Sequence, residues 1–104
     1  MARKAFKMYL IPGNNEEYYR RHNKISQELI QLLRDYCISN YSIYFDEETN
    51  VLFAIYDVDD ESKLEDLKNN KIMKQWWEFM SDIMETNKDK SPKITELQKM
   101  FFLE

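Results

Sequence analysis

The spacing of apolar residues along the chain predicts four strands and two helical regions. Residues 3–11, 38–45, 51–58 and 97–103 are predicted as strands, because side chains at alternate positions separate onto two faces. The five polar residues 46–50 suit a hairpin turn between the second and third strands. The resulting order is strand, helix, strand, strand, helix, strand. It predicts an α+β domain of the ferredoxin-like βαββαβ type, with helices on one face of an antiparallel sheet.

One stripe of residues recurs at steps of three and four through the first helical region, which we expect to run from the turn at residues 12–15 to residue 35 or 36. The stripe consists of Tyr18, His22, Ile25, Leu29, Leu32, Leu33 and Tyr36. His22, the only histidine, is therefore in line with core residues, and Tyr18 shares its face of the helix. This pair is the candidate site, although a lone histidine on an apolar stripe is more often a core residue bonded to a carbonyl.

The second helical region begins with acidic residues at 59–62, which favour a helix start, and Asn69 and Asn70 interrupt it. Its second part places a row of large apolar side chains on one side: Met73, Trp76, Trp77, Met80, Ile83 and Met84. Adjacent residues in a helix differ by about 100°, so Trp76 and Trp77 cannot both point at one spot. One can pack in the core while the other walls a cavity, although packing of both is the more common case. Residues 85–92 are polar and predict a loop.

Length and composition narrow the possible functions. The 104 residues predict one domain spanning 1–104. A net charge of -4 without a long basic block argues against nucleic acid as a partner. No apolar segment approaches the roughly 20 residues that a membrane span requires, so no membrane association is expected and the cytoplasm is the default location. A single cysteine, Cys37, suggests a reducing compartment and is expected to be a small buried residue.

The same composition argues against several kinds of site. One glycine is too few for the Gly-rich loops that bind phosphates. One histidine and one cysteine without clustered spacing make a transition-metal site improbable, and no cofactor is expected. Fifteen aromatic residues suit either a core or a pocket for weakly polar ligands such as sugars.

Both faces of the predicted sheet carry apolar side chains. On residues 51–58, Val51, Phe53 and Ile55 oppose Leu52, Ala54 and Tyr56. Helices of this fold cover only one face, and an uncovered apolar face of this size is usually an interaction surface. We therefore predict a homodimer in which two sheets pack face to face.

The chain resembles the L-rhamnose mutarotase family over essentially its whole length. The matching segments, in order, are Arg3-Lys4-Ala5-Phe6, Glu17-Tyr18, Arg20-Arg21-His22-Asn23, Asn40-Tyr41-Ser42-Ile43-Tyr44, Leu52-Phe53-Ala54, Trp76-Trp77 with Met80 and Asp82, Ser91-Pro92, Glu96-Leu97-Gln98 and Phe101. Many short matches in order, with similar spacing, make a chance resemblance improbable.

The resemblance implies a dimeric α+β barrel, no metal, and an isomerase of the aldose 1-epimerase type that interconverts the α and β anomers of L-rhamnose. It implies that His22 is the proton donor and that Tyr18, Tyr41, Trp76 and Trp77 bind the sugar. Tyr18 can also orient a hydroxyl or relay a proton. The second proton-transfer group stays open between solvent and a carboxylate.

Two other functions are compatible with this fold and composition. Small dimeric α+β barrels also host cofactor-free monooxygenases and haem-degrading proteins, which the aromatic lining and six methionines would suit. A non-enzymatic interaction module with a packed His22 is the third reading. Haem binding or oxygen consumption would favour a monooxygenase or haem-degrading protein. Loss of anomer exchange on His22→Ala would exclude the non-enzymatic interaction module.

Overall fold

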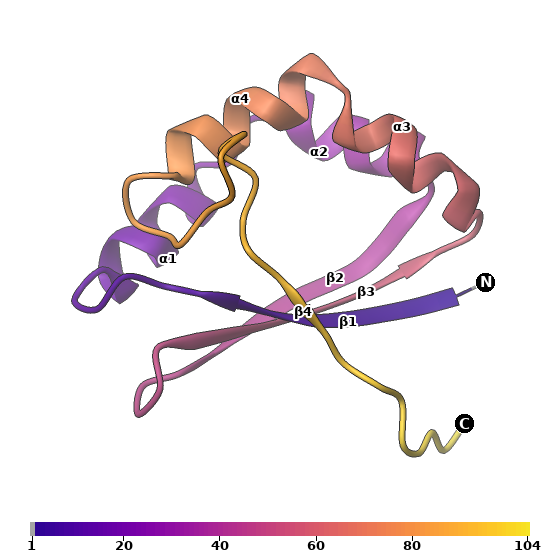
Figure 1. The fold of residues 1–104 in the computed structure, drawn as a ribbon. Coiled ribbons are helices and arrows are strands. Elements are labelled where there is room, and N and C mark those ends of the chain that lie inside the picture. Colours follow the sequence, from indigo (N-terminus) through magenta and orange to yellow (C-terminus); the bar gives the residue numbers. More distant parts are fainter. Residues whose placement is uncertain (1) are drawn as a thin grey trace.

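The computed structural model describes residues 2–104, and in them one antiparallel sheet carries helices on a single face (Figure 1). The strands are β1 (Ala2–Tyr9), β2 (Ile38–Asp46), β3 (Val51–Val58) and β4 (Thr95–Glu96), in the spatial order β2-β3-β1-β4. The helices are α1 (Asn15–Asn23), α2 (Gln27–Asp35), the short 3-10 helix η1 (Glu61–Lys63), α3 (Leu64–Lys68) and α4 (Lys71–Met80). The predicted fold class, ferredoxin-like α+β with helices on one face, is confirmed.

The register of the strands decides which side chains meet the helices. Met8 on β1 lies opposite Leu52 on β3, and Phe6 lies opposite Ala54. Leu52, Ala54 and Met8 are buried in the core, and Phe6 packs against them. Their neighbours along each strand therefore point to the other face of the sheet, as the alternation in sequence predicts.

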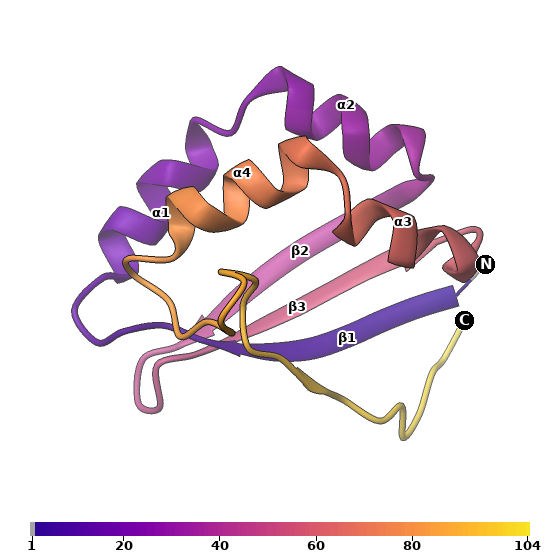
Figure 2. The same ribbon diagram turned by 45° about the horizontal axis from the view of Figure 1, so that its top comes forward.

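The first helical region is two helices, so the prediction of one continuous helix is wrong. α1 ends at Asn23, and α2 begins after Ser26, whose backbone is extended and whose hydroxyl accepts a hydrogen bond from the Leu29 amide at 3.2 Å. A serine in that conformation is a good start for a new helix, which the apolar spacing alone does not reveal. The two helices form one row and α4 and α3 another above the sheet (Figure 2). The apolar stripe nevertheless keeps its inward face, since Tyr18, Leu29 and Leu32 are all buried.

The core between the helices and the sheet consists of two clusters. One contains Met8, Leu10, Tyr18, Leu52, Ala54, Met80, Ile83 and Met84. The other contains Leu29, Leu32, Ile38, Val58 and Leu67. Trp76 packs against both clusters. Its indole therefore joins the two halves of the core, next to the candidate site.

The C-terminal segment does not form the predicted strand over residues 97–103. β4 pairs with β1 only through Thr95 and Glu96, and the Leu97 amide donates one further bond to the Ala5 carbonyl. Beyond it, apolar side chains remain exposed: Met100, Phe101, Phe102 and Leu103. As a strand, this stretch would place apolar side chains on both of its faces, and no second layer covers them within residues 2–104.

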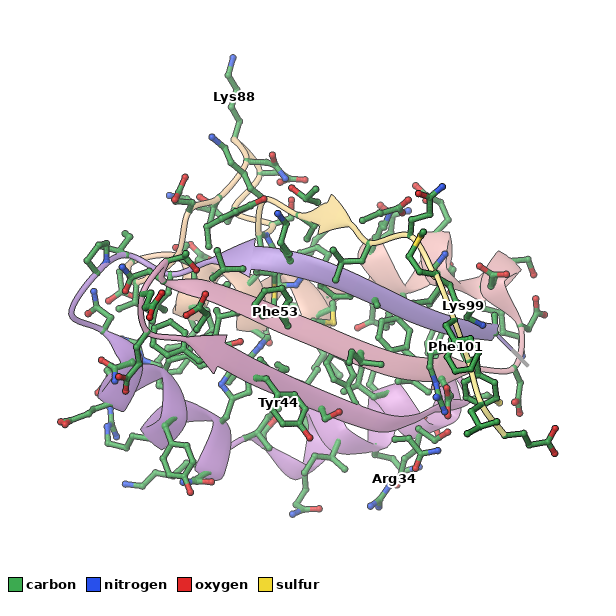
Figure 3. The ribbon with its side chains drawn as sticks, turned by 90° about the horizontal axis from the view of Figure 1, so that it is seen from below. Arg34, Tyr44, Phe53, Lys88, Lys99 and Phe101 are labelled. Atoms are coloured by element: carbon green, nitrogen blue, oxygen red, sulfur yellow. The ribbon has the colours of Figure 1, made fainter. Side chains whose placement is uncertain are left out.

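The face of the sheet opposite the helices is open in the single chain. Figure 3 shows Tyr44 and Phe53 on this face, with Lys99 and Phe101 on the C-terminal segment that crosses one end of the sheet. The Arg3 guanidinium lies over the Phe102 ring at 5.2 Å and attaches this segment to β1.

Two smaller observations complete the fold. Cys37 is exposed, so the expectation of a buried cysteine is wrong: it lies between α2 and β2 in a left-handed conformation, with φ 59°. None of the helices described in residues 2–104 has the length and apolar character to cross a membrane.

Candidate active site

A cavity of about 760 Å³ lies between the helices and the β2 side of the sheet. Its wall comes from α1, α2, α4, β2 and β3, with Ile25 between α1 and α2 and Leu10 just after β1. Cavities that bind small molecules typically measure roughly 300–1,000 Å³ and combine apolar walls with a few polar groups. The apolar wall includes Leu10, Ile25, Leu29, Leu33, Ile43, Phe45, Leu52, Met73 and Trp76. The polar residues of the lining are Asn15, Glu16, Tyr18, Tyr19, His22, Asn23, Tyr41 and Tyr44, of which Tyr44 turns its side chain to the opposite face of the sheet (Figure 3).

His22 is held in this wall by three contacts. Its ring stacks on Tyr18 with centroids 4.3 Å apart, and it meets Trp76 edge-on at 5.2 Å. Its Nδ1 lies 3.0 Å from the backbone carbonyl oxygen of Tyr18, one helical turn earlier. The orientation of the imidazole is therefore set by α1 itself and by α4 across the cavity.

The contact at Nδ1 assigns the proton in neutral His22. A carbonyl oxygen only accepts hydrogen bonds, so Nδ1 must carry the hydrogen. Nε2 is then an acceptor in the neutral ring and becomes a donor only in the imidazolium. Burial lowers the pKa of His22 below its ordinary value of 6.5, against the opposing effect of the Tyr18 carbonyl. At neutral pH the ring is mostly neutral, and the imidazolium that does form is a stronger acid than free histidine.

Tyr18 lies beside His22 as the sequence predicts. It is the one buried residue of α1, and its ring supports the imidazole from one side. Burial raises the pKa of the Tyr18 hydroxyl, and the nearby Tyr41 adds to this rise. A phenol with a raised pKa stays protonated at neutral pH, so Tyr18 can donate a hydrogen bond but is a poor base.

Tyr41 enters the cavity because β2 contains an irregularity. The pairing of β2 with β3 shifts between Ser39 and Ser42, and Asn40 adopts a left-handed conformation with φ 51°. Tyr41 then stacks on Tyr56, with centroids 5.0 Å apart, and lines the cavity. Asparagine tolerates such a backbone better than most residues, and bulges often redirect side chains beside active sites.

The same irregularity is fixed from the far side of the sheet. The Asn40 amide donates to Asp57 Oδ2 at 2.9 Å, and Arg3 Nε donates to Asp57 Oδ1 at 2.8 Å. The bonds from Arg3 and Asn40 lower the pKa of Asp57 to about 2. Asp57 is thus a buried anchor on the open face that holds the backbone at Tyr41.

The two tryptophans separate as helix geometry requires. Trp76 lines the cavity and contacts His22, whereas Trp77 is half-buried and does not belong to the cavity wall. Of the five expected site positions, the structure brings together Tyr18, His22, Tyr41 and Trp76. It does not bring Trp77 to them in the single chain.

Arg21 joins α1 to the end of α4 beside the site. Its side chain is only 11 % exposed. Nε donates to Glu17 Oε2 at 2.7 Å, while Nη1 and Nη2 donate to the two carboxylate oxygens of Asp82 at 2.8 and 3.1 Å. Nη1 also donates to the Phe79 carbonyl at 2.9 Å, and the guanidinium lies 4.5 Å from the Phe79 ring. This clamp fixes the spacing of the two helices that carry His22 and Trp76.

Sequence reasoning missed several polar residues of the wall. Glu16, Tyr19 and Asn23 follow one another at steps of three and four along α1. They form a second stripe beside the one that carries Tyr18 and His22. Their spacing is visible in the sequence, but polar residues at these steps are typical of a solvated helix face. No group of three or more His, Cys, Asp or Glu suited to hold a metal occurs within residues 2–104.

Comparisons with known proteins agree along the whole chain. The family model described as L-rhamnose mutarotase matches residues 3–103. A protein named L-rhamnose mutarotase from Formosa agariphila is 48 % identical over 104 residues, and one from Lachnoclostridium phytofermentans is 46 % identical over 104 residues. In both cases the match covers 100 % of each chain.

Solved structures give the same result at the level of the fold. The crystal structure of L-rhamnose mutarotase FA22100 from Formosa agariphila matches with a TM-score of 0.93 and 46 % identity, covering 100 % of both chains. A conserved protein from Methanosarcina mazei Go1 matches with a TM-score of 0.63 and 16 % identity, over 94 % of this chain and 91 % of that one. The second similarity extends to the fold alone.

Proposed function

This chain belongs to the L-rhamnose mutarotase family and is an isomerase that interconverts the α and β anomers of L-rhamnose; we propose that it does so as an aldose 1-epimerase type of enzyme, by acid and base assistance in the cavity beneath α1. Monooxygenase and haem-degrading activities are not favoured, because relatives that match along the full length are named L-rhamnose mutarotase.

The proposed chemistry needs two proton movements. The ring opens when one group gives a proton to the ring oxygen O5 and another takes the proton of the anomeric hydroxyl, O1. The aldehyde then turns about the C1–C2 bond, and the ring closes on its other face. Assistance by positioned acids and bases typically contributes about a hundredfold to ten-thousandfold. That range is adequate for a reaction that already proceeds in water.

His22 is the proposed donor to O5. The observation that carries this proposal is the contact of Nδ1 with the Tyr18 carbonyl, which leaves Nε2 as the nitrogen that can meet a bound sugar. The imidazolium gives its Nε2 proton to O5 during opening. The neutral ring then presents a lone pair at the same atom and takes the proton back during closure. A single side chain thus serves both directions.

The aromatic residues are proposed to hold the sugar. A pyranose presents C–H groups on its faces, and a deoxysugar adds a methyl group, so both favour apolar walls. Trp76 supplies such a wall beside His22, and Tyr18 and Tyr41 supply hydroxyls at the same cavity. Trp77 stays a proposed binding residue on the strength of the family resemblance alone.

The test is NMR exchange spectroscopy on equilibrated L-rhamnose. Added protein should transfer magnetisation between the two anomeric signals faster than buffer alone, and His22→Ala should abolish the increase. Unchanged exchange with the variant would remove His22 from the mechanism while leaving the activity in place. Trp76→Phe should weaken sugar binding, measured as a raised KM, because the smaller ring leaves part of the wall open.

We further propose a homodimer formed through the open sheet face, in a single-domain protein of the cytoplasm. Phe53 and Tyr44 lie on that face, and Phe101 beside it is 81 % exposed. Contiguous apolar surface of this kind typically marks an interaction site. Sedimentation equilibrium at micromolar concentration should give twice the chain mass. A mass of one chain would rule the dimer out.

A further inference from the structure

The group that takes the proton of the anomeric hydroxyl has to be found among the cavity-lining residues or in solvent. This question rests on the proposed function, since it concerns the second of its two proton movements. The titratable side chains of the wall are one histidine, one carboxylic acid and three tyrosines: His22, Glu16, Tyr18, Tyr19 and Tyr41. The candidate must be a base at neutral pH while His22 acts as the acid.

Tyr18 and Tyr41 do not meet this requirement. Burial raises the pKa of Tyr18, and burial also raises the pKa of Tyr41, with a contribution from Tyr56. Both phenols therefore keep their protons and can only donate hydrogen bonds to an oxygen that becomes negative. They are suited to bind the sugar oxygens and unsuited to remove a proton from them.

Glu16 is the carboxylic acid of the cavity wall within the part of the chain that the structure describes. It lies in the first turn of α1, six residues before His22 on the same helix. Its neighbour Glu17 points elsewhere, because both of its oxygens accept bonds from Arg20 and Arg21 at 2.6 to 2.8 Å. Glu16 is thus an exposed residue of the cavity lining, whereas Glu17 belongs to the clamp that fixes α1.

We propose that Glu16 is the second catalytic residue and accepts the proton of the anomeric hydroxyl of the bound sugar. During opening, the Glu16 carboxylate takes the proton from O1, and the electron pair of that bond forms the second C1–O1 bond. The C1–O5 bond breaks, its electron pair goes to O5, and O5 takes the proton from Nε2 of the His22 imidazolium. The products are the open-chain aldehyde, neutral His22 and protonated Glu16.

Closure reverses both transfers after the aldehyde has turned. Neutral His22 takes the proton of the O5 hydroxyl as O5 attacks the other face of C1, and Glu16 returns its proton to O1. Both side chains regain their starting forms, so the cycle consumes no other reactant. Because Glu16 starts as a carboxylate and His22 as an imidazolium, both proton transfers can take place without free hydroxide or hydronium.

Chemical rescue tests this assignment. The exchange rate of L-rhamnose is measured by NMR for the wild type and for Glu16→Ala, each with and without sodium formate, and the rate in formate buffer without protein is subtracted. We expect Glu16→Ala to lower kcat by about a hundredfold or more. Formate should restore part of it in a saturable manner, because it supplies a carboxylate where the side chain is missing. Glu16→Gln should be equally slow and should not respond, because the amide occupies the space.

Glu17→Ala is the matched control, since it removes a carboxylate from the same helical turn that does not line the cavity. Whatever rate that variant has, formate should not change it. The inference is overturned if Glu16→Ala exchanges as fast as the wild type, or if its loss does not respond to formate. If the wild type itself fails to accelerate exchange, the proposed function fails instead. If the wild type accelerates exchange and His22→Ala does not, the proposed function holds even where the Glu16 assignment fails.

Discussion

Lowering the pH from 7.5 to 6.5 should raise the enzyme-catalysed rate of anomer exchange, because the donation proposed for His22 requires the imidazolium. The Tyr18 carbonyl binds Nδ1, so the neutral ring offers Nε2 only as an acceptor. Burial places the pKa of His22 below 6.5. Throughout this interval the donor form is therefore the minor one, and its population grows as protons are added.

The size of the increase follows from the direction of the shift. For a histidine with a pKa of about 6.5, the charged fraction rises about 5.5-fold between pH 7.5 and 6.5. For any lower pKa the ratio moves toward about tenfold, which is the limit for one proton and one pH unit. The expected increase in kcat/KM lies between these two values. We use kcat/KM because it reports the protonation of the free protein, which is the state that the structure describes.

The assay is the same magnetisation-transfer measurement at several pH values and buffer concentrations. The rate without protein is subtracted at each point, since buffers also assist mutarotation. His22→Gln should lose the pH dependence together with most of the rate. A rate that stays constant or falls as the pH drops to 6.5 would refute the reasoning, because it would show that neutral His22 is the working form.

Three further predictions concern the residues that hold the site in place. Arg21→Lys should lower kcat by up to about a hundredfold, because it loosens the spacing of α1 and α4. Lysine cannot make the forked pair of bonds that arginine makes to Asp82. Circular dichroism should show that the fold is retained. Asn40→Ala should destabilise the protein by about 1–3 kcal/mol in urea unfolding and raise KM, because it loses the left-handed asparagine that orients Tyr41. In Asp57→Asn, the free energy of unfolding in urea should fall less between pH 4 and pH 2 than it does in the wild type. A pKa lowered to about 2 in the folded state contributes stability above pH 3.8, and that contribution disappears as the pH falls through 2.

The elements that depend on a regular repeat were predictable from the sequence. The stripe that carries Tyr18 and His22 faces inward as expected, and the hairpin between β2 and β3 falls at the predicted polar residues. Repeats of this kind report burial directly, because a helix or strand with one buried face repeats its apolar residues at its own period. The pair Tyr18 and His22, and the separation of Trp76 from Trp77, follow from helix geometry alone.

The elements that depend on a single local conformation were not predictable in the same way. The break between α1 and α2 rests on the extended backbone of Ser26, and the entry of Tyr41 into the cavity rests on the left-handed Asn40. Neither changes the apolar pattern. In the C-terminal segment the apolar pattern predicted a strand that does not form. No element in residues 2–104 covers its apolar residues. The place of Glu16 in the cavity lining was also hidden, since a charged residue beside an apolar stripe is typical of a solvated helix face.

The break between α1 and α2 divides the stripe into a stabilising half and a reactive half. On α2, Leu32 is buried among the aliphatic residues of the core, and Leu29, also buried there, lines the cavity with its other side. On α1, the positions that would continue this packing hold Tyr18 and His22, and the space beside them is the cavity. A sheet twists, so a straight helix of about 20 residues, roughly 30 Å long, would diverge from strands of eight or nine residues that it has to cover. Two shorter helices can follow the sheet separately. The arrangement lets α2 keep the fold while α1, fixed by Arg21, positions an imidazole that aliphatic packing would otherwise exclude.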